Sequence, residues 1–127
     1  VEAEGVGAVA DDAPEVQDIP GARRAAMATH LSEPIRDYIV RLVTATRAPP
    51  FSDELAHAAS PRGSLALAAA AKARAWLRGR DHVLPEDVED LAGDALAHRM
   101  VLTWHAQSEG RTARGLVADL LAATEPL

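Results

Sequence analysis

The sequence contains no cysteine and few aromatic residues. Only 3% of its 127 residues are Phe, Trp or Tyr, although 48% are apolar and alanine dominates that fraction. The lack of cysteine excludes a disulfide framework and a thiolate metal site. Because alanine favours helix but buries little area per residue, we expect a core of closely packed helices.

Long apolar runs are also missing. No stretch of about 18 apolar residues is present, which excludes a membrane-spanning helix. The first residues lack the basic start and apolar stretch of a signal peptide. We therefore expect a cytoplasmic chain without a membrane partner. The chain begins at Val1 rather than methionine, which suggests an excised or processed piece of a longer protein.

The net charge of −6 is concentrated at the N-terminus. Residues 1–18 contain no base, and we expect them to form an acidic flexible tail or linker. Their six acids are Glu2, Glu4, Asp11, Asp12, Glu15 and Asp18. The remaining residues carry 13 acids and 13 bases (19 − 6 acids, and all 13 Lys and Arg). This balance argues against a nucleic-acid partner, which would require a basic face.

Motifs for catalysis are absent. The sequence has no Gly-x-x-x-x-Gly-Lys-Ser/Thr loop to hold phosphates and no Gly-x-Ser-x-Gly nucleophile motif. The five histidines are not spaced for zinc binding, so we expect no metal site. The chain by itself is therefore not expected to hydrolyse ATP.

Apolar periodicity predicts helices after residue 18. We expect a first helix over residues 19–29 and a second that Ser32 caps and Pro34 starts. The second has one continuous apolar stripe, formed by Ile35, Tyr38, Ile39, Leu42, Val43 and Thr46.

Three later segments are also predicted to be helices. A loop over residues 48–59 precedes them, and an extended stretch over residues 100–102 lies before the last of them. The expected buried faces are Leu65, Ala69, Ala73 and Trp76 in a central helix; Val88, Leu91, Ala92, Ala95 and Leu96 in the next; and Leu116, Val117, Leu120 and Leu121 in the last. Ser60 caps the central helix and Gly79 ends it, while Thr112 caps the last. With no convincing strand-turn-strand pattern, the prediction is an all-α bundle of four to five helices over residues 19–127.

The start of the central helix carries the main candidate site. Ser60 and Pro61 begin the helix, and Arg62 places a cation in its first turn. The helix dipole disfavours a cation at this end, so Arg62 is either simply solvated or positioned for an anion. Free N–H groups at a helix N-terminus bind phosphate, and a guanidinium adds a bidentate contact.

Two further charged groups have alternative interpretations. Arg74 and Arg78 lie four residues apart and either contact a neighbouring subunit or a nucleotide, or form a solvated stripe. The acids of residues 86–90 are interpreted as partners of the helix dipole on a solvated face rather than as a carboxylate site.

Four segments, in this order, resemble the lid domain of the MoxR family of AAA+ ATPases. They are residues 37–47 (DYIVRLVTATR), 59–67 (ASPRGSLAL), 79–88 (GRDHVLPEDV) and 97–102 (AHRMVL). The resemblance covers residues 19–124. It implies a C-terminal helical lid in which Arg62 matches the sensor 2 arginine that contacts the ATP γ-phosphate.

The same resemblance implies that ATP and Mg²⁺ bind in the parent protein, which would form a ring by contacts between its AAA+ core, this lid and neighbouring subunits. It also implies chaperone-like remodelling of other proteins, often with a partner that contains a von Willebrand factor A domain. Two positions depart from the family pattern: Ala58 replaces a common glycine and Leu84 replaces a capping threonine. The alternative function is a stand-alone, non-enzymatic adaptor that uses the same bundle only to bind proteins.

Overall fold

The computed structural model describes residues 19–126, so the expected acidic tail over residues 1–18 lies outside the described part. The elements are α2 (Ile19–Met27), α3 (Glu33–Ala45), η1 (Phe51–Glu54), β1 (Leu55–His57), α4 (Pro61–Leu77), α5 (Pro85–Leu96), η2 (Ala97–Arg99), β2 (Val101–Leu102), α6 (Trp104–Ser108) and α7 (Ala113–Ala123). The all-α class is confirmed. The described residues form six α-helices, and the short α6 was not predicted.

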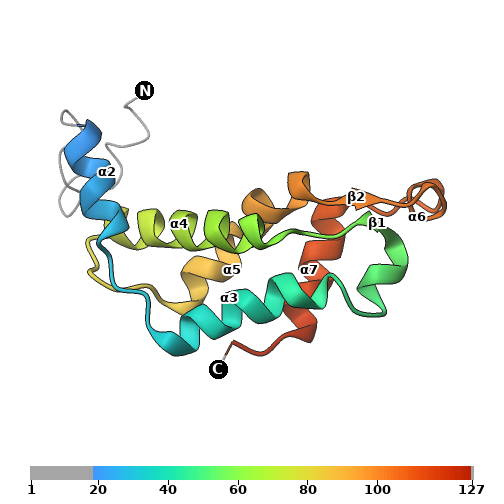
Figure 1. Ribbon diagram of the computed structural model, residues 1–127, viewed down its shortest axis with the longest axis horizontal. Helices are drawn as coiled ribbons and strands as arrows, with labels where there is room; N and C mark the ends of the chain where they lie inside the picture. Colours follow the sequence, from blue (N-terminus) through green and yellow to red (C-terminus); the bar gives the residue numbers. More distant parts are fainter. Residues whose placement is uncertain (1–18, 127) are drawn as a thin grey trace.

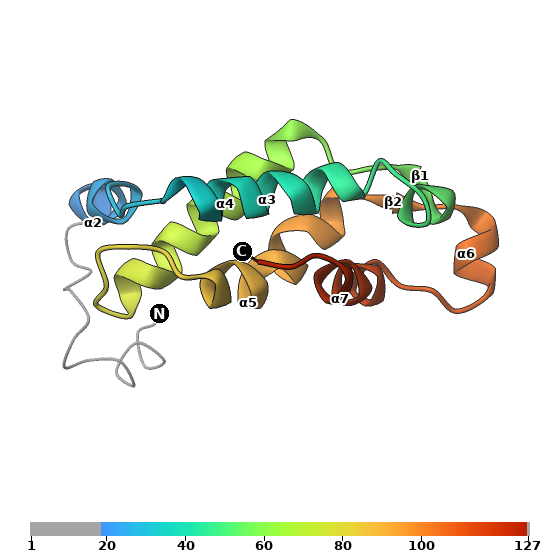
Figure 2. The ribbon, with the colours of Figure 1, turned by 90° about the horizontal axis from the view of Figure 1, so that it is seen from below.

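Helix α4 runs along the middle of the molecule and packs on α2, α3 and α5. Helix α2 lies at one end, whereas α6 lies at the opposite end beside the two strands (Figure 1). Figure 2 shows α3 on one side of the domain and α5 and α7 on the other. The molecule is therefore an elongated helical bundle built around α4.

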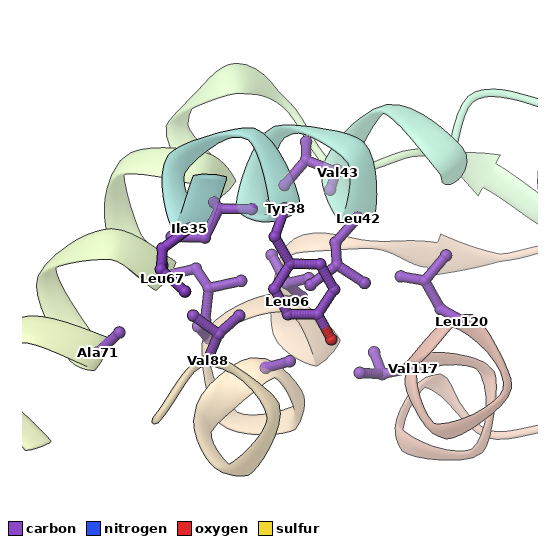
Figure 3. Packing of buried hydrophobic residues seen from close by; sticks show 14 of the residues in the cluster. Ile35, Tyr38, Leu42, Val43, Leu67, Ala71, Val88, Leu96, Val117 and Leu120 are labelled. Carbon is purple, nitrogen blue, oxygen red and sulfur yellow. The ribbon is translucent and has the colours of Figure 1, made fainter. Parts of the chain in front are cut away.

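Helix α3 forms as its sequence predicts. The Ser32 hydroxyl accepts a hydrogen bond from the Ile35 N–H, and Pro34 lies in the first turn. All six residues of the predicted apolar stripe are buried. Tyr38 and Leu42 are fully buried and face α5 and α7 in the centre of the core (Figure 3). The 3.6-residue period of α3 is thus a sufficient guide to its packing.

The prediction for α4 was wrong about its face. Leu65 was expected in the core but is 72% exposed, whereas Leu67 is fully buried. The buried residues of the helix are Gly63, Leu67, Ala71 and Ala75. Because alanines lie on every face of α4, its sequence has no clear apolar period that identifies the buried face.

The expected absence of paired strands is also corrected. β1 and β2 form a two-stranded antiparallel sheet in which Leu55 pairs with Leu102. The strands have only three and two residues and lie far apart in the sequence. Residues 100–102 were predicted to be extended, but their partner could not be identified without the fold.

The two other predicted helices pack as expected. In α5, Val88, Ala92, Ala95 and Leu96 are buried, and Leu91 packs against them. In α7, Leu116, Val117 and Leu120 are buried, with Leu121 packed against the cluster. The Thr112 hydroxyl accepts the Gly115 N–H at 3.0 Å, which confirms the predicted cap.

Candidate functional site: the N-terminus of helix α4

Arg62 lies in the first turn of α4, where the helix cap fixes its backbone. Ser60 is the N-cap, and its hydroxyl oxygen accepts the Arg62 N–H at 3.2 Å. Pro61 occupies the first helical position, where its missing N–H leaves no hydrogen bond unmade. The backbone at Arg62 is therefore fixed, while the residue itself is exposed.

Two contacts position this turn relative to the rest of the domain. Gly63 is buried, and a Cβ atom at this residue would lie 3.2 Å from Leu96 Cδ2. The absence of a side chain thus lets α4 approach the end of α5 closely. On the preceding segment, the Arg47 Nε donates a hydrogen bond to the Ala59 carbonyl at 3.3 Å. Ala59 is fully buried, so the position of the residue directly before the Ser60 N-cap is fixed.

The Arg62 guanidinium has no ion-pair or hydrogen-bond partner among residues 19–126. Its neighbourhood combines a positive helix terminus with a free guanidinium, two groups that favour an anion such as a phosphate. The geometry therefore leaves Arg62 available to a ligand or to another domain.

Arg74 and Arg78, the two other predicted site residues, differ in their surroundings. Arg78 is exposed, and among residues 19–126 its side chain has no hydrogen-bond or ion-pair partner. Arg74 instead forms ion pairs with Asp87 and Asp90 of α5, and its side chain is only 13% exposed. The solvated-stripe interpretation is thus wrong for Arg74, which connects α4 to α5.

Asp87 is the centre of a buried charge cluster that the sequence did not indicate. Its side chain is fully buried, and Arg80 binds both of its oxygens at 2.7 Å. Asp87 also accepts hydrogen bonds from Arg74 and, at 2.8 Å, from the Leu84 N–H. The interpretation of residues 86–90 as a solvated acidic face is therefore wrong at Asp87, although Glu86, Glu89 and Asp90 are exposed.

The surroundings of Asp87 keep it ionised. Burial raises the pKa of its carboxyl, but the hydrogen bonds from Arg80, the Leu84 N–H and Arg74 lower it further than burial raises it. The net pKa lies below the usual value of an aspartate. The partnership is reciprocal, since the hydrogen bond to Asp87 raises the pKa of Arg80.

This cluster also explains how α5 begins without a capping threonine. Leu84 is the N-cap of α5 but has no side-chain oxygen to cap the helix. The Asp87 carboxylate reaches back to the Leu84 N–H, which is the half of a capping box that requires no side-chain oxygen at the N-cap. At the other departure from the family pattern, Ala58 is partly buried directly before Ala59.

Within residues 19–126, no group of three or more His, Cys, Asp or Glu side chains is arranged to hold a metal ion. Over the same residues, no helix combines the length and apolar character needed to cross a membrane.

Residues 45–120 match the family of AAA lid domains, and the chain belongs to this family. Its relatives define the subgroup further: it is the C-terminal lid of a MoxR-family AAA+ ATPase.

The curated relatives are similar over much of the chain. It is 46% identical over 79 residues to "Chaperone MoxR1" of Mycobacterium tuberculosis, covering 58% of this chain and 21% of that protein. It is 41% identical over 85 residues to "Protein MoxR" of Paracoccus denitrificans, covering 59% of this chain and 25% of that protein. The chain thus spans about a quarter or less of these relatives.

A solved structure supports the same fold. A putative ATPase from Cytophaga hutchinsonii aligns with a TM-score of 0.77 and 33% identity, covering 87% of this chain and 34% of that one. The similarity therefore extends over nearly all of the described helices.

Proposed function

We propose that this chain is the nucleotide-sensing lid of a ring-forming AAA+ ATPase and that Arg62 contacts the γ-phosphate of ATP. The observation that carries the proposal is the exposed guanidinium of Arg62, which has no partner within the described residues although its backbone is fixed. An unpaired guanidinium on a fixed backbone is suited to a ligand that another domain supplies.

ATP and Mg²⁺ would bind to the core of the parent protein, because the phosphate-binding loop is missing from this sequence. When the lid closes over the core, Arg62 would add positive charge beside the terminal phosphate and stabilise the charge that develops during phosphoryl transfer. Ser60 and Pro61 would support this contact by fixing the first turn of α4. Closure would couple the nucleotide state to the remodelling of a client protein, with neighbouring subunits and von Willebrand factor A partners contacting the ring.

The decisive experiment is the Arg62→Ala substitution in the full-length parent protein. We expect ATPase activity to fall at least about tenfold, corresponding to about 1.4 kcal/mol. The matched control is Arg36→Ala, since Arg36 is an exposed arginine of α3 whose side chain also lacks a partner in the described part. Unchanged activity in Arg62→Ala, with both variants folded, would refute the sensor role.

The isolated chain provides a second test. Because it lacks the phosphate-binding loop, we expect its affinity for ATP to be weaker than about 1 mM, too weak for a defined titration curve at ordinary protein concentrations. Calorimetry that shows micromolar affinity of the isolated chain for ATP would contradict the assignment of ATP binding to the core.

An adaptor function is the second candidate, and one observation favours it. Trp104 is 88% exposed at the start of α6, and a large exposed aromatic side chain is characteristic of protein-binding surfaces. If the chain is only an adaptor, Trp104→Ser would weaken binding to the partner protein, while Arg62→Ala would leave every activity unchanged.

A further inference from the structure

Helices α2 and α4 line an open groove of about 460 Å³. Helix α2 lies at the end of the molecule opposite α6 (Figure 1). Its lining is apolar apart from Arg23 and includes Ile19, Ala26, Met27, Ala73, Trp76 and Leu77. Ile19 is 61% exposed, although it lies on this groove. The groove therefore offers apolar surface that a further segment of chain would bury.

A second hollow continues the groove along α2. Arg24 and Pro20 line it together with Ile19, Arg23 and Met27, which the two hollows share. The apolar surface is thus bordered by two adjacent arginines of α2.

The charged residues that line this surface have one sign. Among its described lining residues the charged ones are Arg23 and Arg24, and neither α2 nor α4 contains an acidic residue. Arg23 and Arg24 are exposed and have no ion-pair partner within residues 19–126. A complementary occupant must therefore combine negative charge with small apolar side chains.

We propose that residues 1–18 of this chain bind in the α2–α4 groove. They carry six acids and no base, and valines at positions 6, 9 and 16 provide apolar groups. They also join the body at Ile19, which itself lines the groove. The segment would pair its carboxylates with Arg23 and Arg24 and place its valines against Met27 and Trp76.

Attachment at Ile19 reduces the affinity that this contact requires. A short tether gives an effective concentration on the order of 1 mM, so a segment with a Kd of about 0.1 mM would occupy the groove about 90% of the time. Two weak charge pairs and a small apolar contact are compatible with such an affinity. The proposal is independent of the role of Arg62, and either can fail without the other.

The test uses the full chain and its lack of cysteine. An Ala8→Cys variant carries one paramagnetic label on the acidic segment, and broadening of the two tryptophan indole N–H signals is measured by nuclear magnetic resonance. Trp76 lines the groove, while Trp104 lies in α6 at the other end of the molecule (Figure 1). We expect strong broadening of the Trp76 signal and little broadening of the Trp104 signal.

Charge reversal separates binding from simple tethering. In Arg23→Glu with Arg24→Glu, the Kd should rise at least about tenfold, which lowers the occupancy to about half and reduces the broadening at Trp76 accordingly. Sodium chloride at about 1 M should have a similar effect, because it screens these charges. The control Arg36→Glu, which alters an exposed arginine of α3, should leave the broadening unchanged.

Two results would overturn the proposal. One is equal broadening of Trp76 and Trp104. The other is broadening at Trp76 that charge reversal and salt do not change, because a tethered but unbound segment would behave in this way.

Discussion

Substitution of Asp87 by alanine tests whether the buried charge cluster holds α4 and α5 together. The change removes the acceptor for two N–H groups of Arg80, one of Arg74 and the backbone N–H of Leu84. The two arginines then lose their shared partner while their side chains remain only 13% and 21% exposed. Breaking one partner of a buried pair is costly because it leaves unpaired charge with restricted access to water.

We expect this substitution to lower the free energy of unfolding by about 3 kcal/mol, near the lower end of the range for buried pairs, because both guanidinium groups retain some solvent access. For a chain of this size, this corresponds to a decrease in Tm of roughly 12 °C. Urea denaturation followed by circular dichroism at pH 7 would measure it. The matched control is Asp90→Ala, which removes the exposed second partner of Arg74 and should cost less than about 1 kcal/mol.

The pH dependence gives an independent check. Because the pKa of Asp87 is lower in the folded state than its usual value, its contribution is fully present above the unfolded-state pKa of about 3.9 and is lost as pH falls through the folded-state pKa. The difference in stability between the natural sequence and Asp87→Ala should therefore be constant from about pH 5 to 8 and shrink below about pH 4. A loss below about 1 kcal/mol at pH 7, or a difference that grows on acidification, would refute this account of the cluster.

Two other predictions concern packing and capping. Leu67→Ala should destabilise the domain by about 2–5 kcal/mol because Leu67 is fully buried, whereas Leu65→Ala should change stability by less than about 0.5 kcal/mol; equal effects in thermal unfolding would contradict the observed face of α4. Thr112→Ala should cost about 1 kcal/mol by removing the cap of α7, and Thr112→Ser should restore most of it; a stable Thr112→Ala variant in urea denaturation would show that the cap contributes little.

The parts of the fold that could be predicted from the sequence depend on local patterns. The stripe of α3 and the caps at Ser60 and Thr112 follow from spacing within a few residues. Asp87 could not be placed in this way, because its partners Arg74 and Arg80 precede it by 13 and 7 residues and meet it only after α4 and α5 pack together. The pairing of Leu55 with Leu102 likewise depends on the whole fold.

For the candidate site as well, local patterns predicted the helix turn but not the contacts that position it. The cap and Pro61 identified the first turn of α4, and the structure adds that Gly63 and Arg47 fix this turn relative to α5 and the preceding loop. The sequence contains one signal of the close approach, the glycine directly after Arg62. A glycine in the first turn of a helix is compatible with many arrangements, however, and does not by itself predict a contact with Leu96.

The length of α4 has a mechanical consequence. Its 17 residues form a rod about 25 Å long, with Arg62 at one end and the contact with α2 near the other. Since the rod is uninterrupted, a rotation of about 10° imposed at the α2 end would displace the Arg62 end by about 4 Å. The helix thus acts as a lever, which converts a small angular change at one end of the domain into a displacement larger than the length of a hydrogen bond at the other.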